Sequence, residues 1–252
     1  RQRQMCIRDS YTYNDNAKVN LFCFVHAGGS SSYFSQWKRN FSDSVNVIPV
    51  EYPMREKRFM DKMPTSLIEL SNSIASENLD YFKDKPFAFF GHCTGGLIAY
   101  ECAKALSKVH GLDANYLFVS SVLAPEYAKV PSIEGLSDEE FTQFIIESGF
   151  VDKAICENKE LLEYFLPIAR ADFYIHDKYT IQDTSTMPVS IACFNGNSDD
   201  STEDKFKLDA WEKYTSKEFK EYFYEGNHFY LDKHLSELCK QLETLMLNER
   251  NN

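Results

Sequence analysis

The sequence of 252 residues lacks several features that would assign it to common classes of protein. Its apolar runs fall far short of the roughly 20 residues that a membrane-spanning helix needs. It also lacks an excess of basic residues, because 38 acidic and 27 basic side chains give a net charge of −11. An acidic surface argues against nucleic acid or an anionic membrane as the partner. We therefore expect a cytoplasmic protein that binds neither.

Paired cysteines are also missing. The seven cysteines are odd in number and scattered, and none forms a CxxC motif. This pattern argues against zinc binding, a redox motif or a disulfide framework. We expect reduced thiols, no bound metal and no cofactor.

The N-terminal stretch RQRQMCIRDS is basic and polar, and it lacks the apolar region of a signal peptide. We expect residues 1–17 to be a tail outside the fold. The remaining chain is long enough to bury a sizeable core. Its content of 43% hydrophobic and 15% aromatic residues argues against disorder. We predict a single domain over residues 18–250, present as a monomer.

Several short apolar runs have the composition of buried β-strands. Continuous apolar strands indicate burial on both faces, which is typical of a parallel sheet covered by helices. A sixth run, Phe219–Tyr224, alternates between polar and apolar residues, which suits an edge strand. The five apolar runs are Leu21–Val25, Val45–Val50, Phe87–Phe90, Tyr116–Val122 and Val189–Phe194.

Helical patterns separate these strands. Apolar residues recur at helical spacing in Ser66–Phe82, Leu97–Val109 and Leu231–Leu247. Alternating strands and helices predict a doubly wound α/β fold. From Pro131 to about Met187 the pattern is helical only. We therefore predict that residues 131–187 form an inserted helical lid over the C-terminal edge of the sheet.

The segment GHCTGG, Gly91 to Gly96, follows a predicted strand and precedes a predicted helix. A Gly-x-nucleophile-x-Gly segment in this context is typical of a nucleophile elbow, which lifts a reactive side chain to a helix N-terminus. Cysteine replaces the usual serine, so we predict that Cys93 is the nucleophile. A lone cysteine is otherwise more often a small core residue. The elbow context favours the catalytic interpretation.

A nucleophile of this kind needs a base and a group that orients the base. On this fold the expected chain order is nucleophile, acid, histidine. GNSDD follows the strand that ends at Phe194, and we favour Asp199 over Asp200 as the acid. Of the six histidines, only His228 follows the last predicted strand and precedes the last helix. We predict that His228 is the base.

Stabilisation of an oxyanion requires two backbone N–H groups. One is expected from Thr94, the residue after the nucleophile. The other is expected from the glycine-rich loop HAGGSSSYF, His26 to Phe34, which follows the first predicted strand.

With these residues in place, the chain resembles the type II thioesterases of nonribosomal peptide and polyketide synthases. The resemblance runs from about Asn20 to Leu245. It rests on six segments in order: LFCFVHAGGSSSYFSQW, VIPVEYPMREKRF, PFAFFGHCTGGLIAYECAKAL, LPIARADFYIHDKY, GNSDD and EGNHFYL.

The resemblance implies an α/β-hydrolase fold and an acyl substrate held as a thioester. The acyl group would be carried on the phosphopantetheine arm of an acyl or peptidyl carrier protein, which brings this arm with it. Cys93 takes the place of the family's serine, and Asp199 and His228 complete the triad. Ala27 and Thr94 supply the oxyanion N–H groups. The vertebrate medium-chain fatty-acyl thioesterase belongs to the same group, so fatty acid synthesis is another possible setting.

Other functions remain open at this stage. A cysteine acyl-enzyme is itself a thioester, so it can pass its acyl group to an amine or another thiol as well as to water. An acyltransferase or cyclase is therefore an alternative to a hydrolase. A lactone hydrolase with an elbow cysteine is a third possibility, and the HAGGS loop, the PMREKRF segment and the helical insertion argue against it. A non-catalytic module that binds carrier proteins is the fourth.

Two groups of residues are candidates for substrate contacts. Phe144, Ile145, Phe165 and Ile168 of the helical insertion can line an acyl pocket or pack on the sheet. Arg55 and Arg58 of the PMREKRF segment can meet an acidic carrier protein or the phosphate of its arm. A solvated charged loop is an equally good interpretation of the two arginines.

Overall fold

A computed structural model of the chain describes residues 13–148, 155 and 157–248. In this part of the chain, six parallel strands form one sheet in the order β2-β1-β3-β4-β5-β6. All six predicted strands are confirmed, and the alternating run lies at an edge of the sheet. The strands are β1 (Val19–Phe24), β2 (Val45–Pro49), β3 (Phe87–His92), β4 (Tyr116–Ser120), β5 (Ser190–Gly196) and β6 (Phe219–Tyr224).

The central strands are buried along their whole length, as their continuous apolar runs predict. In β1, Phe22 pairs with Ile48 of β2 and with Phe89 of β3. The rings of Phe22 and Phe89 meet edge to face, with their centroids 5.8 Å apart. This core holds the carboxyl ends of the strands in fixed register, and the site is built at those ends.

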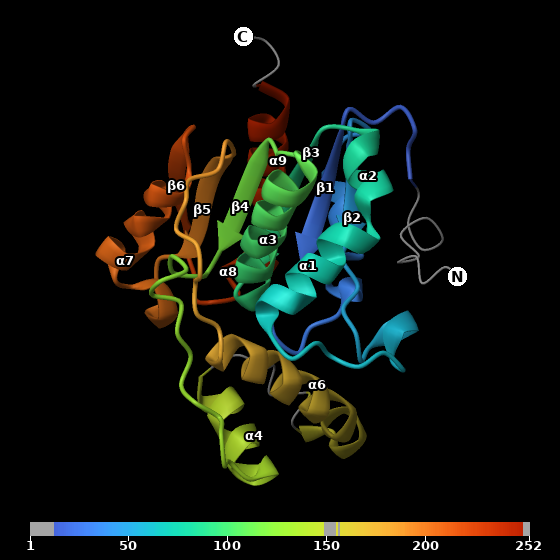
Figure 1. Ribbon diagram of the computed structural model, residues 1–252. Coiled ribbons are helices and arrows are strands. Elements are labelled where there is room, and N and C mark those ends of the chain that lie inside the picture. Colours follow the sequence, from blue (N-terminus) through green and yellow to red (C-terminus); the bar gives the residue numbers. More distant parts are fainter. Residues whose placement is uncertain (1–12, 149–154, 156, 249–252) are drawn as a thin grey trace.

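Helices cover both faces of the sheet (Figure 1). On one face, α1 (Leu67–Glu77) packs beside α3 (Thr94–Ala105), and Ser71 donates a hydrogen bond to the carbonyl oxygen of Ile98. On the other face lies α9 (Leu235–Asn248). The remaining short helices are α2 (Leu79–Asp84), α7 (Lys205–Asp209) and α8 (Tyr230–Lys233). Single turns lie at Ser31–Phe34, Trp37–Asn40, Glu56–Arg58, Leu106–His110, Asp200–Thr202 and Ala210–Tyr214.

Two of the predicted helices are each divided into two. The segment Ser66–Phe82 breaks at Asn78, whose side-chain amide donates to the carbonyl oxygen of Ile74 and ends α1. The segment Leu231–Leu247 breaks at His234, whose Nε2 bonds to the carbonyl oxygen of Glu225. In both cases a side chain bonds to the backbone, which ends one helix and turns the chain before the next one.

Two helices from the segment between β4 and β5 lie across the carboxyl ends of the strands (Figure 1). They are α4 (Asp138–Glu147) and α6 (Lys159–Asp177). A capping box of Ser137 and Glu140 begins α4, and the Asn158 side chain caps α6. The two helices share a small hydrophobic cluster that also contains Ala27, from the loop after β1. The insertion therefore contacts the site directly.

The predicted tail is too long at its C-terminal end. Asn14 exchanges hydrogen bonds with the side chain of Asn46, and Ala17 is buried. The backbone of Asn14 thus pairs with the buried side-chain amide of Asn46 near the start of β2. Residues 13–17 therefore belong to the fold. Residues 1–12, including Cys6, lie outside the described part of the chain, as does Cys156.

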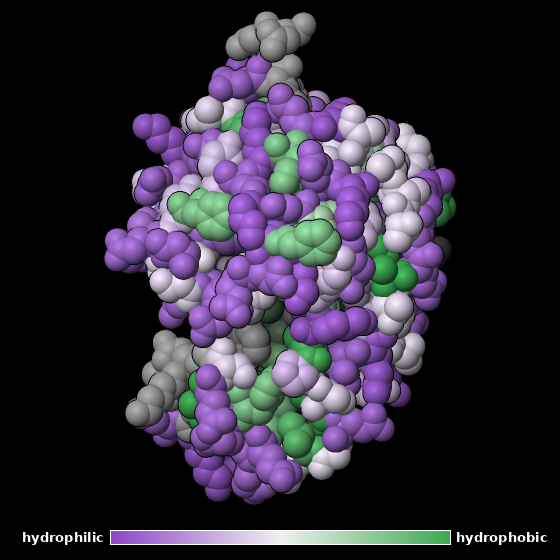
Figure 2. All heavy atoms as spheres, turned by 90° about the vertical axis from the view of Figure 1, so that its left-hand side faces the viewer, coloured by the Kyte–Doolittle hydropathy of each residue, from purple (hydrophilic) through white to green (hydrophobic). Residues whose placement is uncertain are grey.

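Five cysteines lie in the described part of the chain, and all five are free and buried. Each helix in the described part of the chain is either too short or too polar to span a bilayer. Seen toward the β6 edge, the surface is mostly hydrophilic, and apolar side chains gather around a hollow above the helical insertion (Figure 2).

Candidate active site

Cys93 occupies the sharp turn between β3 and α3. Its backbone has φ 55° and ψ −126°, a region that non-glycine residues rarely adopt. A side chain at Gly91 would overlap the backbone of Gly95, and one at Gly95 would overlap the carbonyl oxygen of Phe24. The two glycines are therefore required by close backbone contacts, and the strained turn matches the predicted nucleophile elbow.

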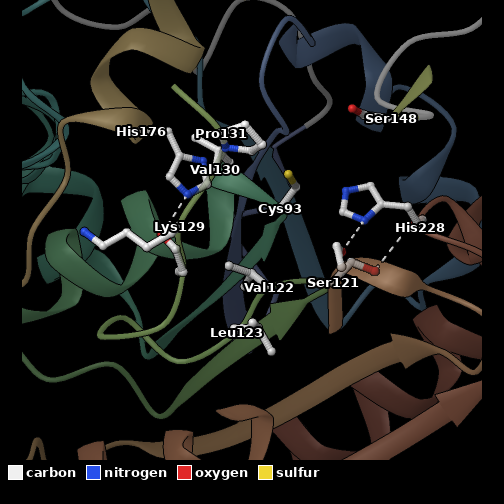
Figure 3. Close-up of a pocket in the computed structure, with 12 residues that line it drawn as sticks. Cys93, Ser121, Val122, Leu123, Lys129, Val130, Pro131, Ser148, His176 and His228 are labelled. Atoms are coloured by element: carbon white, nitrogen blue, oxygen red, sulfur yellow. Dashed lines mark hydrogen bonds between the residues drawn. The ribbon is translucent and has the colours of Figure 1, made fainter. Parts of the chain in front are cut away.

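The Cys93 thiol faces a cavity of 280 Å³ at the carboxyl ends of the strands. Cys93 is only 8% exposed, so its sulfur is reached through this cavity. Apolar side chains, including Val122, Leu123, Val130 and Pro131, line much of it. Figure 3 shows the sulfur between the imidazole rings of His176 and His228. A buried thiol in an apolar cavity suits chemistry on an acyl group.

His228 and Asp199 form a buried hydrogen-bonded pair. Nδ1 of His228 lies 3.0 Å from Oδ2 of Asp199, whereas Asp200 is exposed. Ser201 bonds to the other carboxylate oxygen of Asp199 at 2.6 Å and lies 3.1 Å from Nδ1 of His228. Ser121 donates to the backbone carbonyl of His228. Asp199 thus holds the ring so that Nε2 faces the pocket that contains Cys93.

The electrostatics of the pair favour a charged imidazole. Burial alone would lower the pKa of His228, but the negative charge of the Cys93 sulfur and the hydrogen bond to Asp199 raise it to about 10. Burial alone would raise the pKa of the Asp199 carboxyl, and its hydrogen bond with His228 lowers it below its usual value. The arrangement therefore stabilises an imidazolium between two negative groups.

Two further histidines lie beside His228 and remain neutral. The rings of His92 and His228 have their centroids 5.0 Å apart, and those of His26 and His92 lie 5.8 Å apart. Burial lowers the pKa of His26 to about 3 and the pKa of His92 well below its usual value. Positive charge in this histidine cluster is therefore confined to His228.

The loop after β1 is held by two carboxylates. Oδ2 of Asp172 accepts a hydrogen bond from the N–H of Gly28 at 2.7 Å. Glu56 accepts bonds from the N–H groups of Ser31 and Ser32. Close packing of Gly95 against the carbonyls of Phe24 and Val25 brings the end of β1 next to the start of α3. Ala27 and Thr94 thus lie on two segments that meet beside Cys93.

The prediction that Arg55 contacts a carrier protein or its phosphate is wrong. Arg55 is 1% exposed, and its guanidinium binds both carboxylate oxygens of Asp172, at 2.7 and 2.9 Å. It also donates to the carbonyl oxygen of Gly29 at 2.7 Å. Burial alone would lower the pKa of Arg55, but the adjacent Asp172 raises it. A buried guanidinium with these partners cannot reach a docking protein.

Three of the other predicted substrate contacts, Arg58, Phe144 and Phe165, also lie away from the pocket. Arg58 bonds to Asp61 at 2.9 Å and lines a separate surface cleft. Phe144 and Phe165 pack against the small hydrophobic cluster of α4 and α6. Neither is among the described residues that line the cavity. Phe165 packs directly over Gly28. Both phenylalanines therefore have a packing role, and a role of Arg58 at a docking surface stays a prediction.

His176, which no pattern in the sequence singled out, lines the same cavity as Cys93. Its Nε2 lies 3.2 Å from the carbonyl oxygen of Ala128, and its Nδ1 lies 2.8 Å from the hydroxyl of Thr94. Burial lowers the pKa of His176 to about 4, so the ring is neutral. Because a carbonyl can only accept, Nε2 carries the proton and Nδ1 accepts from the Thr94 hydroxyl.

Ser201 did not stand out in the sequence either, although it lies two residues after Asp199, a spacing at which an aspartate side chain often accepts a hydrogen bond from the backbone N–H, as it does here. For His176 the sequence held no signal, because a histidine on an amphipathic helix is usually a packing or surface residue. Among the described residues, no cluster of three His, Cys, Asp or Glu side chains could hold a metal ion.

The parallel sheet, the elbow and the buried histidine–carboxylate pair together define an α/β-hydrolase. A family model described as "Thioesterase domain" matches residues 19–246. The gramicidin S biosynthesis protein GrsT of Aneurinibacillus migulanus is 30% identical over 241 residues, which cover 92% of this chain and 92% of that protein.

Solved structures agree with this match. RedJ, a thioesterase from the prodiginine pathway of Streptomyces coelicolor, has a TM-score of 0.84 and 28% identity, covering 92% of this chain and 87% of that one. YbtT, a type II thioesterase from the yersiniabactin NRPS/PKS pathway, has a TM-score of 0.79 and 26% identity, covering 91% and 93%.

The chain belongs to the thioesterase family. The predicted α/β-hydrolase fold is confirmed, and the resemblance to type II thioesterases is confirmed at the level of the family.

Proposed function

We propose that the chain hydrolyses acyl thioesters through an acyl-enzyme on Cys93, with His228 as the base and Asp199 as the group that orients it. The observation that carries the proposal is the 3.0 Å bond between His228 and Asp199 beside a cysteine in a strained elbow. This arrangement has the three parts that nucleophilic catalysis needs: a nucleophile, a base and an orienting acid.

In the first half-reaction, the Cys93 sulfur attacks the thioester carbonyl while its proton rests on Nε2 of His228. The carbonyl π pair moves to oxygen, and the N–H groups of Ala27 and Thr94 stabilise the oxyanion. Thr94 suits this role, because the first residue of a helix has no intrahelical acceptor for its N–H. Collapse of the intermediate expels the substrate's thiolate, which takes the proton from His228.

In the second half-reaction, water attacks the acyl-enzyme. Acylation removes the negative charge of the Cys93 sulfur, which is a main cause of the raised pKa of His228. The pKa of the ring then falls, and a neutral His228 can accept a proton from water. The hydroxide attacks the carbonyl, the tetrahedral intermediate collapses, and the Cys93 sulfur leaves while His228 keeps the proton from water, which restores the charged pair of the free enzyme. The products are a carboxylic acid and free enzyme.

The substrate class is an acyl group on the phosphopantetheine arm of an acyl or peptidyl carrier protein. The names of the relatives support this class, since GrsT is a gramicidin S biosynthesis protein and YbtT is a type II thioesterase of the yersiniabactin NRPS/PKS pathway. The cavity of 280 Å³ suits a short acyl group.

The test is release of acid from an acyl carrier protein and from the matching acyl-pantetheine, with and without an amine acceptor. We expect the free acid to be the main product, and we expect Cys93→Ala to abolish its release. A product that is mainly the amide would instead favour an acyltransferase. Unchanged release by Cys93→Ala, or no release by the wild type from several chain lengths, would contradict the proposal.

A further inference from the structure

One face of α6 bonds to both sides of the site where an oxyanion would form. Asp172 and His176 are four residues apart on this helix and therefore project from the same face. Oδ2 of Asp172 accepts a hydrogen bond of 2.7 Å from the N–H of Gly28, the residue after Ala27. Nδ1 of His176 accepts a hydrogen bond of 2.8 Å from the hydroxyl of Thr94. Ala27 and Thr94 are the two proposed oxyanion donors.

The contact at Gly28 is reinforced by Arg55 and by two further residues of α6. Arg55 binds both oxygens of Asp172 and also the carbonyl of Gly29, so it fixes the carboxylate and the loop together. Phe165 and Ala169, also from α6, pack against Gly28. Gly28 has φ 77°, a left-handed conformation that this packing and the Asp172 bond hold in place.

Without α6, the loop would lose these restraints. The N–H of Gly28 would have no carboxylate acceptor. Ala27 would lose the α6 residues that belong to the same small hydrophobic cluster, among them Ala169 and Phe173. The preceding residue, His26, is held from the other side by the rings of His92 and Phe229. The peptide that carries the Ala27 N–H thus lies between a fixed strand end and the inserted helix.

From this geometry we infer that α6 assembles the oxyanion hole, and that Asp172 and His176 are positioning residues that act through Gly28 and Thr94. Docking of α6 then does more than cover the pocket, because it aims the two N–H groups at the reacting carbonyl. The inference rests on the proposed function, which makes Ala27 and Thr94 the oxyanion donors.

The test compares two reactions of Cys93 that differ only in whether an oxyanion forms. A short-chain aldehyde adds reversibly: the sulfur bonds to the aldehyde carbon, and the π pair moves to an oxygen that lies in the hole. Iodoacetamide is attacked at a saturated carbon and expels iodide, so no oxyanion forms. The wild type, Asp172→Asn and His176→Phe are compared for aldehyde inhibition constant and alkylation rate.

We expect Asp172→Asn to weaken aldehyde binding by about 10- to 100-fold, because small displacements of an oxyanion donor carry costs of this order. His176→Phe acts on the side chain of Thr94, and a loss of a few-fold is expected there. Alkylation rates should stay within about twofold of wild type in both variants. The matched control is Asp138→Asn, which removes an exposed ion pair between α4 and Arg170 of α6 and should change neither reaction.

Unchanged aldehyde binding in both Asp172→Asn and His176→Phe would overturn the inference. A parallel loss of both reactions together with a lower melting temperature would also overturn it, because it would indicate a purely structural role. Because His176→Phe leaves the buried Arg55–Asp172 pair intact, it provides a test even if Asp172→Asn does not fold. A wild-type enzyme that neither binds the aldehyde nor forms an acyl-enzyme would instead contradict the proposed function itself.

Discussion

His228 and Asp199 share a buried hydrogen bond of 3.0 Å, and the opposite edge of the His228 ring faces the pocket that holds Cys93. The ring is therefore placed between a carboxylate and a thiol. Its charge depends on both neighbours.

We expect His228 to be protonated at neutral pH in the free enzyme. Its pKa of about 10 lies above the ordinary value, so the ring should lose its proton only as the pH rises toward 10. Titration by NMR of labelled imidazole nitrogens would measure this directly. In Cys93→Ala the negative sulfur is absent, and the pKa of His228 should fall. A ring that titrates near 6.5 in the wild type, or one unaffected by Cys93→Ala, would contradict the prediction.

Asp199→Asn should lower kcat by roughly 10²- to 10⁴-fold, because an amide no longer holds the imidazole in the right tautomer or stabilises its charge. The control is Asp200→Asn, since Asp200 is exposed and the next residue in the chain. We expect this variant to retain nearly the activity of the wild type. The measurement is steady-state hydrolysis of an acyl-pantetheine. Equal losses in the two variants would show that the assignment of the acid is wrong.

Arg55→Met should destabilise the protein by about 3–5 kcal/mol, because it leaves the Asp172 carboxylate buried without its counter-ion. Replacement of both partners, in Arg55→Met with Asp172→Leu, should cost less than the sum of the two single changes. Urea unfolding of the three variants measures both quantities. A change below about 1 kcal/mol for Arg55→Met would mean that the pair contributes little to stability.

The strands and the elbow were predictable because their signals are local. Five continuous apolar runs and one alternating run identify all six strands, and the glycines on both sides of Cys93 mark the turn. The chain order of Cys93, Asp199 and His228 follows from how strands and helices alternate in this fold. No contact between distant residues was needed for these steps.

What could not be predicted depends on partners far apart in the chain. Arg55 resembles a solvated residue in a charged loop, and only the fold brings it to Asp172, 117 residues away. The role of His176 depends in the same way on Thr94, 82 residues away. The breaks at Asn78 and His234 arise from side chains that bond to the backbone, which helical periodicity does not reveal.

The most direct test of the account is intact-mass spectrometry of the protein mixed with an acyl-pantetheine thioester, followed by peptide mapping. We predict one acyl group per chain, located on Cys93, that disappears over time as the free acid is released. Asp199→Asn should slow both the appearance and the loss of this adduct. A wild-type protein that releases acid with no acyl group ever found on Cys93, or that carries it on another residue, would contradict the account.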